Sequence, residues 1–244
     1  MPRFFSTVFG KSAWPASSNW SIIHILVGSS SSIDPAARVL VCFAVKEEAK
    51  FFVTTQCERI ITGMGVRNAT KGIEGALSKN KPDLVLTTGF AGGLNPRLKT
   101  GSVVFEEDED AGLRSLLTGL NATPVRFHCA DRVAVTSAEK KALWVATGAD
   151  VVEMESSIIR KVCRAQKIPS ATIRVISDAA DEDLPLDFNA LMTPDERIDF
   201  GKLAWKLMCG PQKIPQLMQF QKRTIAAARN LADVLEKLLL ARRR

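Results

Sequence analysis

The sequence predicts an α/β fold with a mostly parallel sheet flanked by helices. The 244 residues suit one large domain of this class. Continuous apolar runs such as 39–45 are typical of strands that are buried on both faces. These runs alternate with helical patterns at the spacing of βαβ units, which favours a parallel sheet.

The expected elements alternate from residue 38 onward. The apolar run 38–45 predicts the first strand, and Lys46 opens a helix that ends near Phe52. A turn at Gly63 leads into the next helix, because apolar residues return there every three or four positions. The expected buried face of that helix carries Val66, Ala69, Ile73 and Leu77. The next strands are expected at 58–63, 83–89 and 102–105.

The middle of the chain mixes loops with short elements. Residues 106–122 open with an acidic run and continue as a helix. We interpret the acids as a solvated loop, because they lack the glycine of a calcium-binding loop. Further strands are expected at 124–129 and 133–135. Ser137 is expected to cap the helix 138–147, without a capping box because Lys140 stands three residues on.

Two strands that each end in carboxylates carry the strongest functional pattern. A short apolar strand at 151–152 leads to Glu153 and Glu155, and a strand at 171–176 leads to Asp178. Ligands in open α/β sheets bind at the carboxyl ends of strands. We therefore expect these acids in one partly desolvated pocket, where their pKa values can be pushed apart.

The two ends of the chain differ from this core. Residues 1–37 are Ser-rich and are expected to form a disordered or loosely attached extension. Residues 38–244 are expected to form one α/β domain, in which 187–244 is mainly helical and broken at Gly210 and Pro215. The last helix places one apolar seam at Leu217, Phe220, Thr224, Ala227, Leu231, Leu235 and Leu238.

Composition excludes several classes of site. Only two histidines occur, too few for a metal site built from several histidines, and a Ser-His-Asp triad would have to use one of them. No metal is therefore expected. The five cysteines are scattered without a CxxC pair, which favours a reduced, cytoplasmic setting. No apolar run approaches the 18 or so residues that span a bilayer.

The formal charge of +7 comes largely from the C-terminal helix and tail. Residues 211–244 hold eight Lys or Arg against Asp233 and Glu236, without a nucleic-acid motif. We expect no nucleic-acid partner. A solvated face is the plain interpretation, and contact with an anionic membrane surface is the sharper one.

Two glycine-rich turns follow predicted strands. Residues 63–68 (GMGVRN) resemble a dinucleotide fingerprint, but Asp83 begins its strand, whereas a ribose-binding acid must follow one. A nicotinamide or flavin is therefore not favoured, and no cofactor is expected. Residues 88–93 (TGFAGG) form a small-residue loop in which backbone N–H groups can approach a ligand.

Carboxylates follow the predicted strands at Glu48, Glu153, Glu155 and Asp178. Each alone can be an acid that the dipole of a following helix favours. That interpretation is weaker for Asp178, which stands in a stretch with few charges. Four such acids along one sheet edge favour a carboxylate-based site.

Taken together, these motifs resemble the nucleoside phosphorylase superfamily, and within it the methylthioadenosine/S-adenosylhomocysteine nucleosidases. The resemblance covers 38–181 and rests on five motifs in order, including TGMGVRNA, PDLVLTTGFAGGL, VVEMES and IRVISDAAD. The subgroup that looks most similar is the hopanoid-associated phosphorylase family, which shares TGAD before VVEMES and a CGPQKIPQL-like stretch. The resemblance implies a three-layer fold with a central mixed, mostly parallel sheet.

The resemblance also implies roles in cleaving an N-glycosidic bond of a purine (adenosyl) nucleoside. Asp178 matches the acid that protonates N7 of the leaving base, and Glu48 matches the residue that activates water. Glu155 matches the acceptor of the ribose hydroxyls, and Met154 packs under the sugar. Further residues expected near the substrate are Phe90, Ala91, Gly92, Val133, Glu153 and Ser177. Carboxylate pairs perform equivalent work in glycosidases.

The sequence departs from the family pattern at positions that bear on the reaction. Phe90 replaces a serine of the nucleosidases, and Val133 falls where an aromatic residue would stack on the purine. The residues after the first strand lack the arginine that a phosphate pocket would want, which favours hydrolysis. Lys46 and Arg67 leave phosphorolysis open, with phosphate as co-substrate, and a catalytically inactive nucleoside-binding protein is a third alternative.

The expected partners and location follow from the same resemblance. We expect a homodimer or larger homo-oligomer that binds a small-molecule nucleoside in the cytoplasm. Peripheral membrane contact through the basic C-terminal helix is a further hypothesis.

Overall fold

A computed structural model describes residues 38–193, 195 and 199–242. The expectation of a loosely attached extension at 1–37 lies outside these residues. In the described part, the strands form one mixed sheet in the order β2-β1-β3-β8-β4-β5, with β7 paired to β3 and β6 paired to β7. The strands are β1 (Val39–Phe43), β2 (Glu58–Ile61), β3 (Leu84–Gly93), β4 (Val103–Glu107), β5 (Thr123–Pro124), β6 (Phe127–Cys129), β7 (Val151–Glu153) and β8 (Ser170–Asp178).

The sheet is mostly parallel, as the sequence predicts. Neighbours β2, β1, β3 and β8 run parallel, whereas β4 pairs antiparallel with β8 and β7 pairs antiparallel with β3. The α-helices are α1 (Lys46–Ala49), α2 (Gly65–Leu77), α3 (Arg114–Gly119), α4 (Ser137–Thr147), α5 (Ser156–Ala165), α6 (Phe200–Cys209) and α7 (Ile214–Ala241). Short 3-10 turns are η1 (Glu109–Ala111), η2 (Asn189–Leu191) and η3 (Pro211–Lys213).

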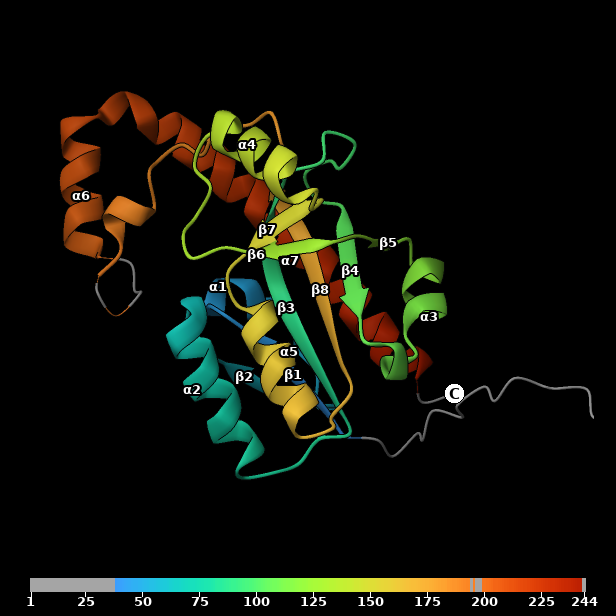
Figure 1. Ribbon diagram of the computed structural model, residues 1–244. Helices are drawn as coiled ribbons and strands as arrows, with labels where there is room; N and C mark the ends of the chain where they lie inside the picture. Colours follow the sequence, from blue (N-terminus) through green and yellow to red (C-terminus); the bar gives the residue numbers. More distant parts are fainter. Residues whose placement is uncertain (1–37, 194, 196–198, 243–244) are drawn as a thin grey trace, which may run out of the picture. The chain divides into compact units, whose positions relative to one another are not determined.

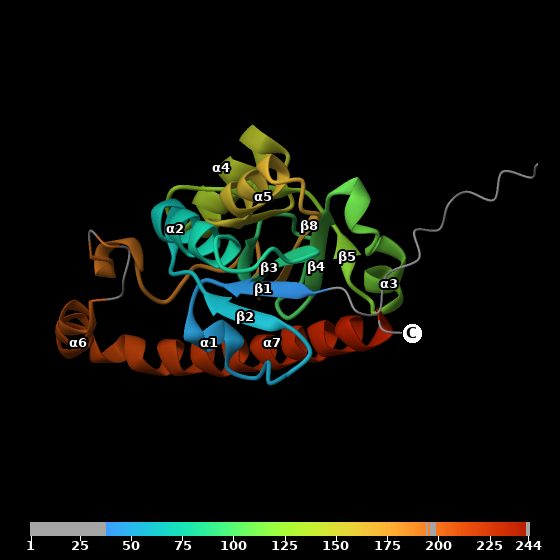
Figure 2. The same cartoon turned by 90° about the horizontal axis from the view of Figure 1, so that it is seen from below.

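Side-chain alternation along the central strands produces three layers (Figures 1 and 2). Val41 and Phe43 of β1 pack in the cluster that contains α7, and Leu40 and Cys42 pack in the cluster with α2 and α5. Because successive residues of a strand point to opposite faces, a strand that is apolar throughout needs cover on both sides. The continuous run at 39–43 therefore explains why helices lie on both faces of the sheet.

The long helix α7 covers one face with the seam that the sequence predicts. Leu231, Leu235 and Leu238 are fully buried, and Phe220 and Thr224 are half-buried. Pro215 does not break this helix, contrary to expectation, because it stands in the first turn, where the missing N–H has no helical partner to lose.

Other local expectations were wrong in informative ways. Residues 133–135 form no strand. Thr136, rather than Ser137, caps α4, and Glu139 completes a capping box. Val66 is exposed, whereas the other three residues of the expected face of α2 are buried. The acidic run is also not a free solvated loop, since Glu106 and Asp108 pair with Arg160 of α5.

A β-bulge places two of the candidate site residues at the carboxyl end of the sheet. Ala91 of β3 pairs with Ile176 of β8, but Gly92 pairs with Asp178, so Ser177 is the extra residue. Bulges bend a strand locally and re-aim its side chains. This irregularity turns Ser177 and Asp178 toward the edge where β1 and β7 also end.

Candidate active site

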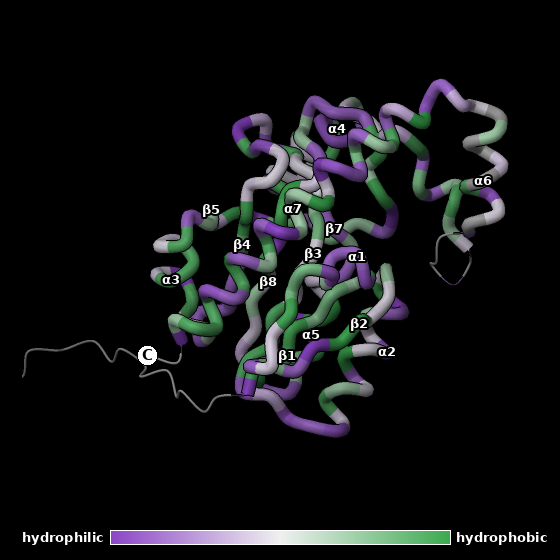
Figure 3. Tube along the Cα trace, turned by 180° about the vertical axis from the view of Figure 1, so that it is seen from behind, coloured by the Kyte–Doolittle hydropathy of each residue, from purple (hydrophilic) through white to green (hydrophobic). Residues whose placement is uncertain are grey.

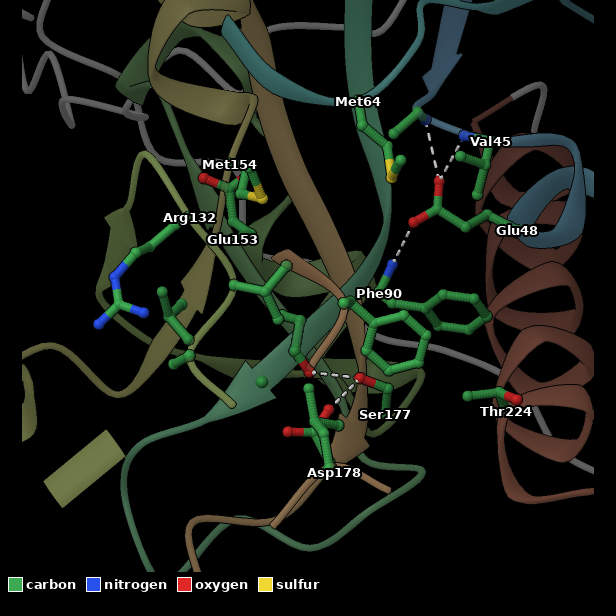
Figure 4. Close-up of a pocket in the computed structure, with 18 of the residues that line it drawn as sticks. Val45, Glu48, Met64, Phe90, Arg132, Glu153, Met154, Ser177, Asp178 and Thr224 are labelled. Carbon is green, nitrogen blue, oxygen red and sulfur yellow. Dashed lines mark hydrogen bonds between the residues drawn. The ribbon is translucent and has the colours of Figure 1, made fainter. Parts of the chain in front are cut away.

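A cavity of about 320 Å³ opens at this edge of the sheet (Figure 4). All ten candidate residues of the sequence line it, namely Glu48, Phe90, Ala91, Gly92, Val133, Glu153, Met154, Glu155, Ser177 and Asp178. Glu48 and Asp178, 130 positions apart in the sequence, occupy separate parts of its wall. The cavity thus brings together four acids that three different segments of the chain deliver.

Backbone amides hold the carboxylate of Glu48. Its Oε2 accepts hydrogen bonds from the N–H groups of Ala44 (2.9 Å) and Val45 (3.2 Å) at the end of β1. Its Oε1 accepts the N–H of Phe90 at 2.8 Å. Burial raises the pKa of Glu48, and Arg174 with these three donors opposes the shift. The result is a fixed carboxylate with a raised proton affinity, which suits a general base.

Two further carboxylates, Glu153 and Glu155, stand at the end of β7 and just after it. Glu155 Oε1 accepts the N–H of Gly65 at 3.0 Å, at the start of α2. Glu153 Oε2 accepts the N–H groups of Glu155 (3.0 Å) and Ser156 (2.8 Å), which fixes the turn into α5. Burial raises the pKa of Glu155 to about 7, because Arg174 offsets it only in part and Glu153 adds to it.

Arg174 links these three acids from below the cavity floor. It stands in the middle of β8 with its side chain 1% exposed, and does not itself line the cavity. Its Nη2 lies 2.7 Å from Glu153 and 3.3 Å from Glu155, and its Nη1 lies 4.0 Å from Glu48. Burial lowers the pKa of Arg174, but the carboxylates, Glu153 first, outweigh burial and raise it. The arginine remains charged and compensates acids that would otherwise repel one another.

Gly89 leaves room for this arrangement. Its φ is +141°, and a Cβ there would stand 2.3 Å from Glu48 Oε1 and 2.6 Å from Arg174 Nη1. Any side chain would therefore separate the acid from the guanidinium. Residues 88–93, expected as a loop, instead continue β3 to Gly93. The close approach of Glu48 and Arg174 accounts for the glycine at position 89 of this strand.

Asp178 has a cation of its own on the other part of the wall. Its Oδ2 lies 2.5 Å from Nζ of Lys140, which comes from α4 and is fully buried. The Ser177 hydroxyl donates to Oδ1 at 2.5 Å. A buried carboxylate with an ammonium and a hydroxyl beside it is held in one orientation at the cavity surface.

Mostly apolar side chains line the rest of the cavity, together with Thr224 and Arg132. Phe188 and Phe220 pack with ring centroids 6.0 Å apart, and Met64 extends from the glycine turn. Leu184, Met192 and Thr224 complete this side. A cavity of this kind suits a flat or apolar ligand with a few fixed polar groups.

Two important residues were missed from the sequence. Arg174 stands inside an apolar strand run, and a charge at such a position was the available signal. Lys140 was noted only as an obstacle to a capping box. Nothing in a helix pattern marks a lysine whose partner, Asp178, lies 38 positions away.

The glycine turn at 63–65 does not serve as a dinucleotide fingerprint. The N–H of Gly65 is already bound to Glu155, and Asp83 pairs with Arg38 at the opposite end of β3. Met64 does line the cavity, so the turn approaches a ligand space as expected. Within the described residues, no group of His, Cys, Asp and Glu has the arrangement of a metal site.

Known proteins share sequence similarity with this chain. The Phosphorylase superfamily model matches residues 109–208. The chain is 27% identical over 164 residues to 5'-methylthioadenosine/S-adenosylhomocysteine nucleosidase of Glaesserella parasuis serovar 5 (strain SH0165). That match covers 54% of this chain and 71% of the relative.

Solved structures share the fold at low identity. The same kind of nucleosidase from Campylobacter jejuni superposes with a TM-score of 0.62 at 18% identity, covering 83% of this chain and 98% of that one. The Helicobacter pylori nucleosidase with butyl-thio-DADMe-Immucillin-A gives 0.64 at 14%, covering 84% and 98%. Futalosine hydrolase of Helicobacter pylori gives 0.60 at 17%, covering 84% and 98%. The chain therefore has this α/β fold.

Replacing Gly89 by alanine tests the close approach of Glu48 and Arg174. We expect Gly89→Ala to lower the free energy of unfolding by roughly 2–4 kcal/mol, from backbone strain and overlap. Gly75→Ala is the matched control, since nothing lies within 4 Å of a Cβ at Gly75 in α2. Urea unfolding measures both. Equal, small effects would show that the space beside Gly89 is not needed.

The raised pKa of Glu155 predicts a pH dependence of stability. Between the ordinary value of 4.5 and about 7, the folded chain keeps a proton that the unfolded chain has lost. The free energy of unfolding contributed by Glu155 therefore falls as pH rises through this window. We expect urea unfolding from pH 4.5 to 7.5 to show a shallower fall in Glu155→Gln than in wild type. The exposed Glu58→Gln should keep the wild-type slope, and a steeper fall in Glu155→Gln would contradict the assignment.

Proposed function

We propose that this chain is a member of the Phosphorylase superfamily that cleaves the N-glycosidic bond of a purine nucleoside by water. Asp178 serves as the general acid and Glu48 activates the attacking water. The observation that carries the proposal is the single cavity whose wall holds both acids, each fixed by its own partners. The match to the superfamily model and the nucleosidase relative support the same chemistry.

The reaction needs one carboxyl group on each side of the N-glycosidic bond, one beside the sugar and one beside the base. As the bond from the sugar to the base lengthens, the sugar becomes oxocarbenium-like and the purine becomes basic. Glu48 takes a proton from water as the water oxygen bonds to C1′, and its raised pKa makes it an effective acceptor. Asp178 delivers a proton to the purine, so that the base leaves neutral.

The other candidate residues position the nucleoside in this proposal. Glu155 accepts the ribose hydroxyls, with Met154 under the sugar. Glu153 acts indirectly, because its oxygens already bind Arg174, Ser156 and the N–H of Glu155. Ala91, Gly92 and Val133 line the space assigned to the base, and Ser177 orients Asp178.

Hydrolysis is favoured over phosphorolysis by the placement of cations. Among the described residues that line the cavity, the only cationic side chain is Arg132, which is paired with Glu139 and 65% exposed. Arg174 is committed to the three glutamates, and Lys46 and Arg67 are exposed outside the lining. A phosphate beside Glu48 would therefore find, among the described residues, only guanidinium groups that carboxylates already bind.

Phe90 and Val133 favour the alternative of a nucleoside-binding protein without turnover. Phe90, however, fixes Glu48 through its backbone N–H, which any residue could supply. Its side chain adds an apolar wall in place of a polar one. Base release therefore decides between the two functions.

A membrane surface is the macromolecular partner that we propose. Most of α7 from Leu231 to Leu239 is part of the core, so the contact is assigned to the earlier stretch 200–230, which holds six Lys or Arg and no Asp or Glu. In that stretch Trp205 (67%), Met208 (73%) and Met218 (54%) are exposed, and α6 stands away from the sheet (Figure 3). Exposed apolar side chains among basic ones suit an anionic lipid surface. No described helix is long and apolar enough to cross a bilayer.

The proposal also covers the 5′ substituent of the substrate and the assembly of the chain. The cavity reaches Phe220 in α7, near the basic stretch, and its apolar side would accept a 5′ substituent. The hopanoid-associated subgroup would make that substituent a lipid. A homodimer or larger homo-oligomer is proposed by resemblance to the superfamily.

Base release by wild type and two variants tests the mechanism. We expect wild type to release adenine from 5′-substituted adenosines at the same rate with and without phosphate. Asp178→Asn and Glu48→Gln should each lower turnover by at least about 10²-fold, because each removes one proton transfer. The exposed neighbour Glu47→Gln is the control. Wild-type rates in Asp178→Asn would remove Asp178 from the mechanism, and binding without release would establish the inactive alternative.

Vesicle sedimentation tests the membrane contact. We expect binding to phosphatidylglycerol vesicles but not to phosphatidylcholine, and about tenfold weaker binding for Trp205→Ser, because an indole no longer enters the interface. Trp144→Ser in α4 is the control. Concentration-dependent self-association that Trp205→Ser abolishes, without vesicle binding, would show instead that a second copy of the chain covers α6.

A further inference from the structure

Lys140 is a buried lysine with an unusual set of partners. Its side chain is 0% exposed and projects from α4 toward the end of β8. Nζ lies 2.5 Å from Asp178 Oδ2 and donates to the carbonyl oxygens of Ala179 (2.8 Å) and Glu182 (2.6 Å). An ammonium has three donors, so these contacts use all of them.

Only one of these three partners can accept a proton. The carbonyl oxygens of Ala179 and Glu182 bind hydrogens but are not bases, whereas the carboxylate of Asp178 is one. Full burial keeps water from the other sides of Nζ. A proton that leaves Lys140 therefore passes to Asp178, whose carboxyl group lines the cavity.

The loop beside Lys140 has other restraints. Glu182 accepts the N–H of Ala179 at 3.0 Å and the Thr100 hydroxyl at 3.3 Å, and it pairs with Arg223 of α7 at 2.5 Å. Holding this loop does not require a buried cation. An uncompensated lysine is expensive to bury, so its charge has to be explained by the carboxylate that it meets.

The pairing also raises a chemical question for the proposed function. Nζ of Lys140 lies 2.5 Å from Asp178 Oδ2, so the two groups form a buried ion pair. An ionised carboxylate cannot donate a proton to a leaving base. The acid thus needs a local proton source at the moment of bond cleavage.

We propose that Lys140 and Asp178 act as one proton-donating unit, in which Lys140 supplies the proton that Asp178 passes to the departing purine. This inference rests on the proposed function. As the bond from C1′ to the base breaks, its electron pair moves to the purine. One proton moves from Nζ to the Asp178 carboxylate and one from the carboxyl group to the base, which leaves neutral lysine. After the base departs, Glu48 releases to solvent the proton that it took from the attacking water, and one proton returns from solvent to Lys140 through Asp178.

Lys140 is a positioning and proton-supplying residue in this scheme, since it does not line the cavity. Arginine at the same position would keep the positive charge and the donors. A guanidinium cannot be deprotonated in proteins, however, so it could not supply the proton. The two substitutions Lys140→Met and Lys140→Arg therefore separate charge from proton supply.

Two substrates distinguish proton supply from a structural role. A purine nucleoside needs a proton on its leaving group, whereas 4-nitrophenyl β-D-riboside releases a stable phenolate without one. Both use the same attack of water assisted by Glu48. A variant that has lost its fold fails with both substrates.

The experiment measures kcat for wild type, Lys140→Met, Lys140→Arg and the exposed control Lys141→Met with both substrates, from pH 5 to 8. We expect Lys140→Met and Lys140→Arg each to lose at least about 10²-fold with the purine nucleoside at pH 8. Both should stay within about fivefold of wild type with the nitrophenyl riboside. The purine deficit of Lys140→Met should shrink toward pH 5, because solvent then supplies more readily the proton that Lys140 no longer provides.

Three results would overturn the inference. Wild-type purine turnover in Lys140→Arg would show that charge alone is needed. Equal losses with both substrates, independent of pH, would show that Lys140 only supports the fold. Turnover of neither substrate by wild type would remove the proposed function itself, and the inference with it.

Discussion

The charge of one buried arginine is the constraint on which the rest of the site depends. Arg174 stands in the middle of a strand whose neighbours are apolar, where an unpaired guanidinium would be prohibitively costly. Glu153, Glu155 and Glu48 compensate it, the first two from the turn between β7 and α5 and the third from α1. Gly89 permits the approach, and backbone amides from β1 and α2 take up the remaining oxygens. Removing the arginine would leave three buried acids facing one another.

A second buried cation divides the cavity into two electrostatic halves. Lys140 pairs with Asp178, whereas Arg174 serves the glutamates on the other half. Both halves depend on β8. The bulge at Ser177 lets Asp178 reach the cavity at the end of this strand, whereas Arg174 stands in its middle, below the cavity floor. One strand therefore supplies a fixed cation and an acid to two parts of one cavity. In the proposed reaction, these parts serve the attacking water and the leaving base.

The sequence predicted the layers of the fold better than their local detail. Continuous apolar runs at β1 and β3 identified strands buried on both faces, because every residue of such a strand faces a covering layer and the run can be recognised without knowledge of distant contacts. The strand expected at 133–135 is a loop, because its short apolar run packs by way of tertiary contacts and has no partner strand. The cap of α4 was displaced by one residue, since Thr136 and Glu139 satisfy each other's backbone. Pro215 was assigned as a break, although the first turn of a helix tolerates proline.

In the candidate site, too, local sequence patterns predicted some residues and missed others. Carboxylates that follow apolar strands could be identified because ligands in open α/β sheets bind at the carboxyl ends of strands, and all ten of the expected residues line the cavity. The acids after β7 reach the same cavity although that strand runs antiparallel to β3. The partners of Arg174 and Lys140 could not be identified, since they lie in distant segments. The charge of Arg174 inside an apolar run was a local signal of burial, whereas Lys140 had none.

A structure of the protein with a purine C-nucleoside bound tests the central claim most directly, because the carbon bond between sugar and base survives hydrolysis. We expect C1′ to face Glu48 across one ordered water, N7 to lie within hydrogen-bond distance of Asp178, and the sugar hydroxyls to reach Glu155. A nucleoside bound with its base toward Glu48, or bound outside the cavity between the two acids, would contradict the account.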